Sequence, residues 1–172
     1  SSVEIVLARR AESTFAVSES VAARFREKGI EPIILSNYSI ADLDIPYNPD
    51  RSGRKLMFVA GNIHAFHGVG ECIRAVSRVR EHYPDVSLTL VGNVREDLDE
   101  HINGSDQNEF ITSTGFLPYR EMYEKLNEGT AALLVFQPTY HNISIGLPNK
   151  LFDYMLLGLP VIASDLPEIR NV

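Results

Sequence analysis

From residue 55 onward, short apolar runs alternate with amphipathic segments, and this alternation limits the fold more than any other feature of the sequence. The expected strands are KLMFVAGN, VSLTLVGN, FITSTGFL, AALLVFQP and PVIAS, and the expected helices are VGECIRAVSRVREHY, a weak EDLDEHIN, YREMYEKLNEG and PNKLFDYMLLG. The first strand is apolar almost throughout, as expected for a strand buried on both faces. Strands and helices that alternate over short connections form right-handed βαβ units. The sequence therefore predicts an α/β fold with a doubly wound parallel sheet.

The residues before 55 are expected to form a smaller part of their own. They contain a short helical run near residues 3–11, a strand in TFAVS, a helix in SESVAARFREKG and a strand in EPIILSN. Ser18 or Ser20 can cap the second helix, and Gly29 can end it. Residues 38–54 hold two prolines, Gly53 and several aspartates, which predicts a loop or linker. We therefore divide the chain into residues 1–37, a linker at 38–54 and a second domain at 55–172.

Charge and cysteine content exclude some functions. The formal net charge of −7 argues against a generic nucleic-acid binder, because such binding depends on clustered Lys and Arg. Cys72 is the single cysteine, so no intrachain disulfide can form and a reducing compartment is expected. No secretory signal and no apolar run long enough for a membrane span is visible. We expect a cytoplasmic protein and leave open a peripheral attachment to the inner face of a membrane.

In sheets of this kind, ligands bind beyond the carboxyl ends of the strands, which selects the loops at 60–70, 92–96, 115–119 and 137–149. The first loop, AGNIHAFHGVG, matches neither the dinucleotide fingerprint nor the P-loop. Its glycines and the helix that follows favour an anion such as phosphate, and an ordinary connection is an equal alternative. His64 and His67 lie three residues apart in this loop. No further ligands accompany them, so no metal site is expected.

The last predicted helix is apolar nearly all round from residue 151 to 157, which predicts burial on most sides. Asp153 is its only charge after Lys150, and a buried carboxylate must be hydrogen-bonded or paired. Two interpretations stay open. The two residues can form an ordinary ion pair along a helix. Alternatively, both project into the ligand crevice, where Lys150 meets a phosphate and Asp153 accepts hydrogen bonds from ribose hydroxyls.

The run GLPNKLFDYMLLGLPVIASDLPE resembles the signature region of the retaining GT-B glycosyltransferases of glycosyltransferase family 4. Further segments resemble parts of that family in the same order: FAVSESVAARFREKGIEPIILSN, FVAGNIHAFHG, LTLVGN and STGFLPYREMYEKL. The resemblance covers most of the chain. It implies that residues 55–172 are the Rossmann-like, donor-binding domain, incomplete at its C-terminus. Residues 1–37 are then the tail of the acceptor domain.

The same resemblance implies transfer of a sugar, with retention, from a nucleotide-diphosphate sugar to a saccharide or lipid-linked acceptor. The implied setting is polysaccharide or glycoconjugate biosynthesis, with no cofactor and no metal. The acceptor would be held by an N-terminal domain that this chain lacks, so the fragment alone is expected to be inactive. No residue is assigned as catalytic. By position in the family's motifs, the donor-binding candidates are Gly61, Asn62, His67, Gly115, Phe116, Leu117, Asn149, Lys150 and Asp153.

The chain departs from the family pattern where that pattern carries charge. Asn62 stands in place of an Arg, His67 in place of a Lys and Ile145 in place of a Glu, and Asp153 replaces a second Glu. Lys150 can supply positive charge, and so can His67 when it is protonated. Losing two charge-assisted contacts weakens diphosphate binding unless they are replaced. A degenerate, non-catalytic module that supports a partner enzyme is therefore the main alternative. Another nucleotide-using α/β enzyme, such as a sugar epimerase, is a third.

Overall fold

The computed structural model describes residues 2–39, 44–53, 55–64, 67–95, 98, 109–137 and 145–172. The chain divides into two units. The terminal unit comprises Ser1–Tyr38, Pro138–Asn149 and Asp165–Val172, and the α/β unit comprises Ser39–Gln137 and Lys150–Ser164.

The α/β unit is built on a parallel sheet with the strand order β5-β4-β3-β6-β7. Its strands are β3 (Lys55–Ile63), β4 (Ser87–Val94), β5 (Ile111–Ser113), β6 (Ala131–Leu134) and β7 (Val161–Ala163). Every neighbouring pair in this order is parallel, which confirms the predicted doubly wound α/β fold. The chain winds from β3 outward to β5, crosses back to β6 and continues to β7. The direction of winding therefore reverses between β3 and β6.

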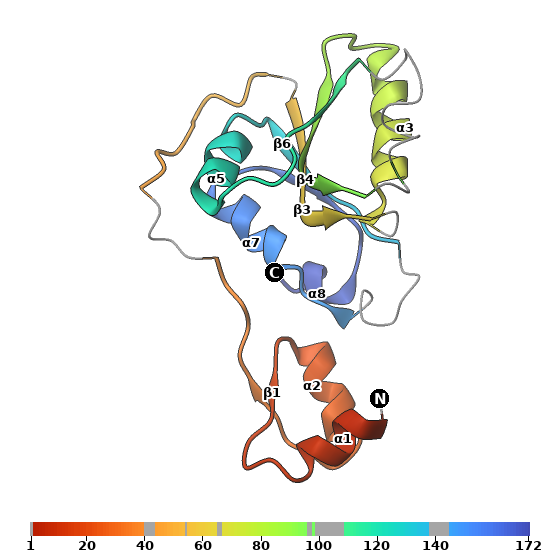
Figure 1. Cartoon of the computed structure of the whole chain (residues 1–172), viewed down its shortest axis with the longest axis vertical. Helices are drawn as coiled ribbons and strands as arrows, with labels where there is room; N and C mark the ends of the chain where they lie inside the picture. The colour runs from red at the N-terminus through yellow and green to blue at the C-terminus, as the bar shows by residue number, and fades with distance from the viewer. Residues whose placement is uncertain are drawn as a thin grey trace. The chain divides into compact units, whose positions relative to one another are not determined.

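Helices cover both faces of this sheet. The described helices of the unit are α3 (Val69–Arg80), α5 (Tyr119–Asn127) and α7 (Asn149–Leu156). Figure 1 shows α3 on one face and α5 and α7 on the other, as the reversal of winding requires. The weak helix expected in EDLDEHIN lies almost wholly outside the described residues.

The core beneath α3 follows the apolar spacing of the sequence. Val69, Cys72, Ile73 and Val76 are buried, whereas Val79, which continues the same helical spacing, is 42% exposed. Burial raises the pKa of the Cys72 thiol to about 12, so this cysteine is a core residue and not a nucleophile.

The prediction that α7 is buried on most sides is only partly correct. Leu151, Asp153 and Tyr154 are buried, but Met155 is 50% exposed and Leu156 is 41% exposed. Both exposed side chains lie near the end of the helix. Helical periodicity identifies a buried stripe, and it cannot show whether a second apolar stripe is also covered.

The described part of the segment predicted as a linker, at 38–54, has no regular structure, and residues of it pack within the α/β unit. The Arg51 guanidinium donates to the backbone carbonyls of Asn127 and Gly129 at the end of α5 (both 2.7 Å) and to that of Leu157 after α7 (2.7 Å). Arg51 thereby satisfies carbonyl groups that helix ends leave unpaired, where a positive charge is favoured. The Tyr47 ring packs so closely on Gly158 that an added Cβ would lie 2.6 Å from a ring carbon.

The terminal unit contains α1 (Ser2–Ala8), β1 (Phe15–Ala16), α2 (Glu19–Arg26), β2 (Ile33–Ile34) and α8 (Pro167–Arg170), and β1 pairs in parallel with β2. Ser18 is the cap of α2: its hydroxyl accepts from the Val21 N–H (3.3 Å) and donates to the carbonyl of Ile145 (3.1 Å). The buried Glu168 carboxylate accepts from the Ser20 N–H at 2.7 Å. These contacts join three separate segments of the chain into one unit. Among the residues that the structure describes, no helix is long and apolar enough to cross a membrane.

Candidate functional site

The ligand edge of the α/β unit centres on the carboxyl ends of β3 and β6, because the winding reverses between them. Gly68, with φ of +69°, begins α3 at this point. A Cβ on Gly68 would lie 2.8 Å from the Val135 side chain and 3.1 Å from the Val135 carbonyl oxygen, so only glycine fits. Next to it, the Gln137 amide donates to the Glu71 carboxylate at 2.7 Å. The start of α3 and the segment after β6 are therefore packed directly together.

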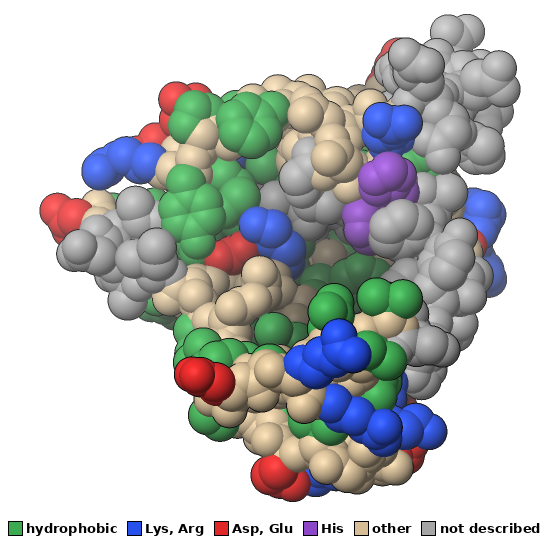
Figure 2. Space-filling view, turned by 60° about the horizontal axis from the view of Figure 1, so that its bottom comes forward, with side chains coloured by type: hydrophobic (Ala, Val, Ile, Leu, Met, Phe, Trp, Pro, Cys, Tyr) green, Lys and Arg blue, Asp and Glu red, His purple; other side chains and the backbone are tan. Residues whose placement is uncertain are grey.

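His67 lies at this edge as a neutral side chain. Its Nδ1 accepts a hydrogen bond from the His64 N–H at 3.1 Å, and its ring contacts Phe136 edge-on with centroids 5.8 Å apart. Burial, and then the charge of His64, hold the pKa of His67 below its ordinary value. His67 therefore supplies positive charge only at a pH lower than an ordinary histidine requires. Figure 2, turned so that the ends of these strands come forward, shows histidine side chains at the surface.

Asp153 is the centre of a buried hydrogen-bond network on the other face of the sheet. Its side chain is 3% exposed. One carboxylate oxygen, Oδ1, accepts from the hydroxyls of Ser39 (2.5 Å), Tyr123 (2.5 Å) and Tyr119 (3.4 Å). The other, Oδ2, accepts from the Lys150 ammonium at 2.9 Å. We call these five side chains the Asp153 network.

The network keeps Asp153 ionised. Burial by itself would raise the pKa of this carboxyl, but the hydrogen bonds from Ser39, Tyr123 and Lys150 outweigh burial and lower it. Burial and the hydrogen bond to Asp153 also raise the pKa of Tyr123, so its hydroxyl remains a donor. The pair expected between Lys150 and Asp153 is thus present, but it is not an ordinary surface pair, because the carboxylate is out of water.

The remaining predicted residues lie in three separate parts of the chain. Gly61 and Asn62 lie in the last part of β3, where the pairing with β4 is irregular, and Asn62 is exposed. Gly115, with φ of +67° and open space beside it, follows β5. Phe116 is 69% exposed and Leu117 is half-buried, and the chain then enters α5. Asn149 is exposed at the start of α7.

Sequence reasoning identified Lys150 and Asp153 but missed Ser39, Tyr119 and Tyr123. The two tyrosines lie four residues apart on α5, which places them on one helical face, and their rings pack edge-on with centroids 4.8 Å apart. That spacing was a signal, although tyrosines on an apolar helical face are more often part of a core. Ser39 lies 114 residues from Asp153, and nothing in the sequence links the two.

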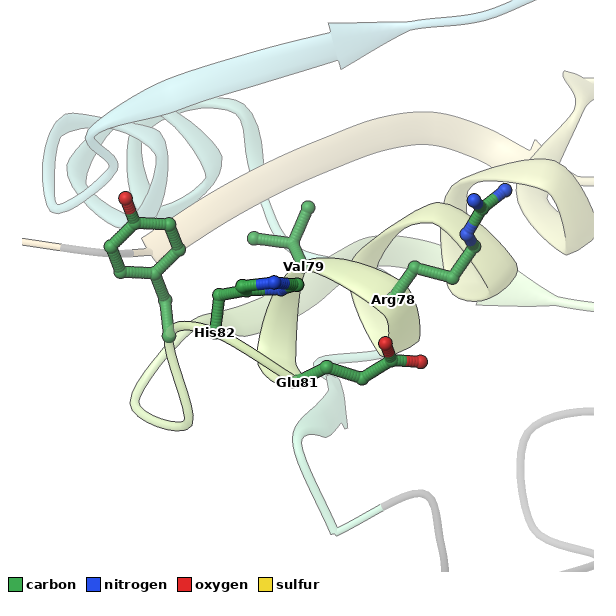
Figure 3. Close-up of a pocket in the computed structure, with 5 residues that line it drawn as sticks. Arg78, Val79, Glu81 and His82 are labelled. Carbon is green, nitrogen blue, oxygen red and sulfur yellow. The ribbon is translucent and has the colours of Figure 1, made fainter.

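A shallow pocket of about 310 Å³ lies at the opposite edge of the α/β unit. It is lined by Arg78, Val79, Glu81, His82 and Tyr83 at the end of α3, as Figure 3 shows. Because α3 runs back against the strands, this end of the helix lies at their amino ends, away from the ligand edge. In the described part of the chain, no group of three or more acidic, histidine or cysteine side chains is arranged to hold a metal ion.

The fold is shared with solved glycosyltransferases. The chain superimposes on the pneumococcal O-GlcNAc transferase GtfA, solved with UDP and GlcNAc, with a TM-score of 0.73 and 15% identity. TarM of S. aureus gives a TM-score of 0.76 and 13% identity, and the lipopolysaccharide outer core galactosyltransferase WaaB gives 0.63 and 17%. The alignments with GtfA and TarM cover 96% of this chain and 32% of those proteins, and the alignment with WaaB covers 91% and 44%. The chain thus spans about a third of the length of the first two.

These likenesses establish the Rossmann-like, GT-B type of fold. No curated protein sequence matches the chain significantly. A sequence model of the family described as "Glycosyl transferases group 1" matches residues 53–172, which include β3 to β7 and the whole Asp153 network except Ser39. The chain therefore belongs to the group 1 glycosyl transferases.

Proposed function

We propose that the protein transfers a sugar, with retention, from a nucleotide-diphosphate-sugar donor to an acceptor, and that the α/β unit binds the donor. The observation that carries the proposal is the ionised Asp153 held against Lys150 at the start of α7, on the ligand edge of the sheet. Family membership supports sugar transfer. The solved relatives GtfA and TarM were crystallised with UDP, which supports a nucleotide donor.

In this proposal each predicted residue meets a different part of the donor. Gly115–Leu117 face the base, the Asp153 network lies near the ribose, and Lys150 contacts the diphosphate. Gly61, Asn62 and His67 approach the phosphates beside the start of α3, where backbone N–H groups favour an anion. Asn62 is uncharged and His67 is neutral, so Lys150 is the one cation among the predicted residues. Its charge, with the helix dipole, stabilises the leaving diphosphate.

The proposal also covers the acceptor substrate and the part of the protein that binds it. A saccharide or lipid-linked acceptor is held by a separate acceptor domain, of which residues 1–37 are the tail. The reaction needs no cofactor and no metal, serves polysaccharide or glycoconjugate biosynthesis, and takes place in the cytoplasm or at the inner face of the membrane. The domain division at the linker, residues 38–54, belongs to the same proposal.

A non-catalytic, glycosyltransferase-like support for a partner enzyme is the second candidate. The neutral state of His67 favours it, together with the uncharged side chains of Asn62 and Ile145, because all three weaken the grip on a diphosphate. The two candidates differ in one measurable property: only the transferase must bind a nucleotide diphosphate.

Calorimetric titration of the full-length protein with UDP, GDP and their sugar conjugates tests the proposal. We expect one nucleotide to bind. Replacing Lys150 with Met should then weaken binding about 10- to 100-fold, the loss expected for one charge-assisted contact of about 1.5–3 kcal/mol. Lys125→Met is the matched control, because Lys125 lies at the far end of α5, paired with Glu128, and should leave affinity unchanged. If no nucleotide binds, the transferase proposal fails and the supporting module remains.

A further inference from the structure

The Asp153 carboxylate is surrounded by protein donors. An ionised carboxylate offers about four lone-pair positions. Three hydroxyls and one ammonium already point at its two oxygens, and the side chain is 3% exposed. Oδ1 accepts all three hydroxyls and Oδ2 accepts the ammonium alone, so it is burial, and not a lack of lone pairs, that keeps a ligand hydroxyl from Asp153. The residue that the sequence selected for ligand contact is therefore closed off by its own neighbours.

Hydrogen-bond direction shows where the network opens. Asp153 is ionised and can only accept, so the fully buried Tyr123 donates its proton to it. The Tyr123 oxygen can then only accept further hydrogen bonds, and the hydroxyls beside it are those of Tyr119, at 2.9 Å, and Ser39. Tyr119 must donate inward, either to Tyr123 or to Asp153 at 3.4 Å. In both cases its proton points into the network, and its oxygen lone pairs remain available to an outside donor.

Tyr119 is also the accessible and fixed end of the network. It is 43% exposed, whereas Tyr123 and Asp153 are buried. Its ring packs edge-on against Tyr123, at an interplanar angle of 64°, which holds the hydroxyl in place. Tyr119 is the first residue of α5, two residues after Leu117. It thus lies between the segment proposed for the base and the lysine proposed for the diphosphate, and in a nucleotide the ribose lies between these groups.

We infer that Tyr119 accepts a hydrogen bond from a ribose hydroxyl of the donor nucleotide, and that Asp153 acts through it as a positioning residue. The inference rests on the proposed function and names the contacting atom of the same site. Asp153 accepts the hydrogen bond from Tyr123, and the Tyr123 oxygen is then free to accept from Tyr119. The oxygen of Tyr119 is the acceptor that remains for the ligand. The ligand group is a hydroxyl donor, so the site should distinguish a ribonucleotide from its deoxy form.

The test combines a side-chain change with a ligand change in the full-length protein. Tyr119→Phe keeps the ring and removes only the hydroxyl, and the probes are UDP, 2′-deoxy-UDP and 3′-deoxy-UDP, or the guanine series if GDP is the nucleotide that binds. We expect Tyr119→Phe to weaken ribonucleotide binding about three- to tenfold, the usual range for one neutral hydrogen bond. The unchanged protein should bind one of the two deoxy nucleotides correspondingly more weakly. Tyr119→Phe should bind that deoxy nucleotide and the ribonucleotide equally.

Each other outcome gives a distinct answer. If the ribonucleotide binds and Tyr119→Phe leaves both affinity and deoxy discrimination intact, the inference is overturned and the proposed function stands. If Tyr119→Phe weakens all three ligands alike, the hydroxyl acts through packing and the inference is again overturned. If the unchanged protein binds no nucleotide diphosphate, the proposed function and the inference fail together. Tyr47→Phe is the matched control, since this exposed tyrosine packs on Gly158 and should change neither quantity.

Discussion

Replacing Asp153 with Asn tests whether the Asp153 network holds α5 and α7 together. The asparagine keeps the shape of the side chain and its acceptor oxygen, so the hydroxyls of Tyr123 and Ser39 keep a partner. The new amide group, however, donates toward Lys150, which is itself a donor. The substitution therefore removes the charge-assisted hydrogen bond of 2.9 Å and leaves the lysine facing another donor.

The size of the effect follows from burial. Breaking a buried ion pair by removing one partner costs about 3–5 kcal/mol, because an uncompensated charge stays buried. Here the carboxylate is 3% exposed but the Lys150 side chain is 29% exposed, so the ammonium can turn toward water. We therefore expect a loss near the value of the hydrogen bond itself, about 2–3 kcal/mol of unfolding free energy. For a chain of this length, that corresponds to a fall in Tm of about 5–10 °C.

Urea unfolding followed by circular dichroism measures this loss as a change in midpoint at constant slope. Glu124→Gln is the control, because Glu124 also lies on a helix beside a basic partner, Arg120 at 3.1 Å, but that pair is exposed. Its loss should cost about 0.5 kcal/mol or less. Equal losses for Asp153→Asn and Glu124→Gln would refute the claim that burial makes the Asp153 network strong.

Two further predictions use the same unfolding assay. Gly68→Ala should lower the free energy of unfolding by about 2–4 kcal/mol, because the new Cβ adds a contact of 2.8 Å with Val135 to the strain of a positive φ. Gly115 also has a positive φ but has open space beside it, so Gly115→Ala should cost only about 1–2 kcal/mol. Equal costs would argue against the close packing of Gly68 on Val135. The pKa of His67 is lowered in the folded protein, so in mild acid the unfolded chain binds more protons than the folded chain. The contribution of neutral His67 to the free energy of unfolding is therefore present above about pH 6.5 and is lost as the pH falls toward the folded pKa. His67→Gln should therefore reduce the loss of stability between about pH 7.5 and 5.5. An unchanged loss would mean that His67 has the same pKa in the folded and the unfolded chain.

The fold was largely predictable because its determinants are local. Apolar runs at strand length, helical spacing such as Val69, Cys72, Ile73 and Val76, and short connections together predict a parallel α/β sheet. The cap of α2 was narrowed to Ser18 or Ser20, and the structure selects Ser18. The ligand edge also follows from strand order, since the carboxyl ends of parallel strands meet on one side.

Individual residues of the candidate site could be predicted from the sequence, but their hydrogen-bond partners could not. The sequence identified Lys150 and Asp153, because a charge in an apolar helix demands a partner. It could not show that Tyr123 and Ser39 also donate hydrogen bonds to Asp153, because these residues lie 30 and 114 positions away along the chain. It named His67 as a source of charge when protonated, but it could not show the burial that lowers the pKa of this side chain.

The sequence by itself therefore determined the α/β fold, the ligand edge and the presence of one acid and one base at the start of α7. Only the tertiary structure decided how they act. The Asp153 side chain is buried, Tyr119 is the exposed end of the Asp153 network, and the backbone N–H of His64 donates to the His67 ring. The physical reason is that periodicity depends on neighbours along the chain, whereas protonation and hydrogen-bond direction depend on neighbours in space.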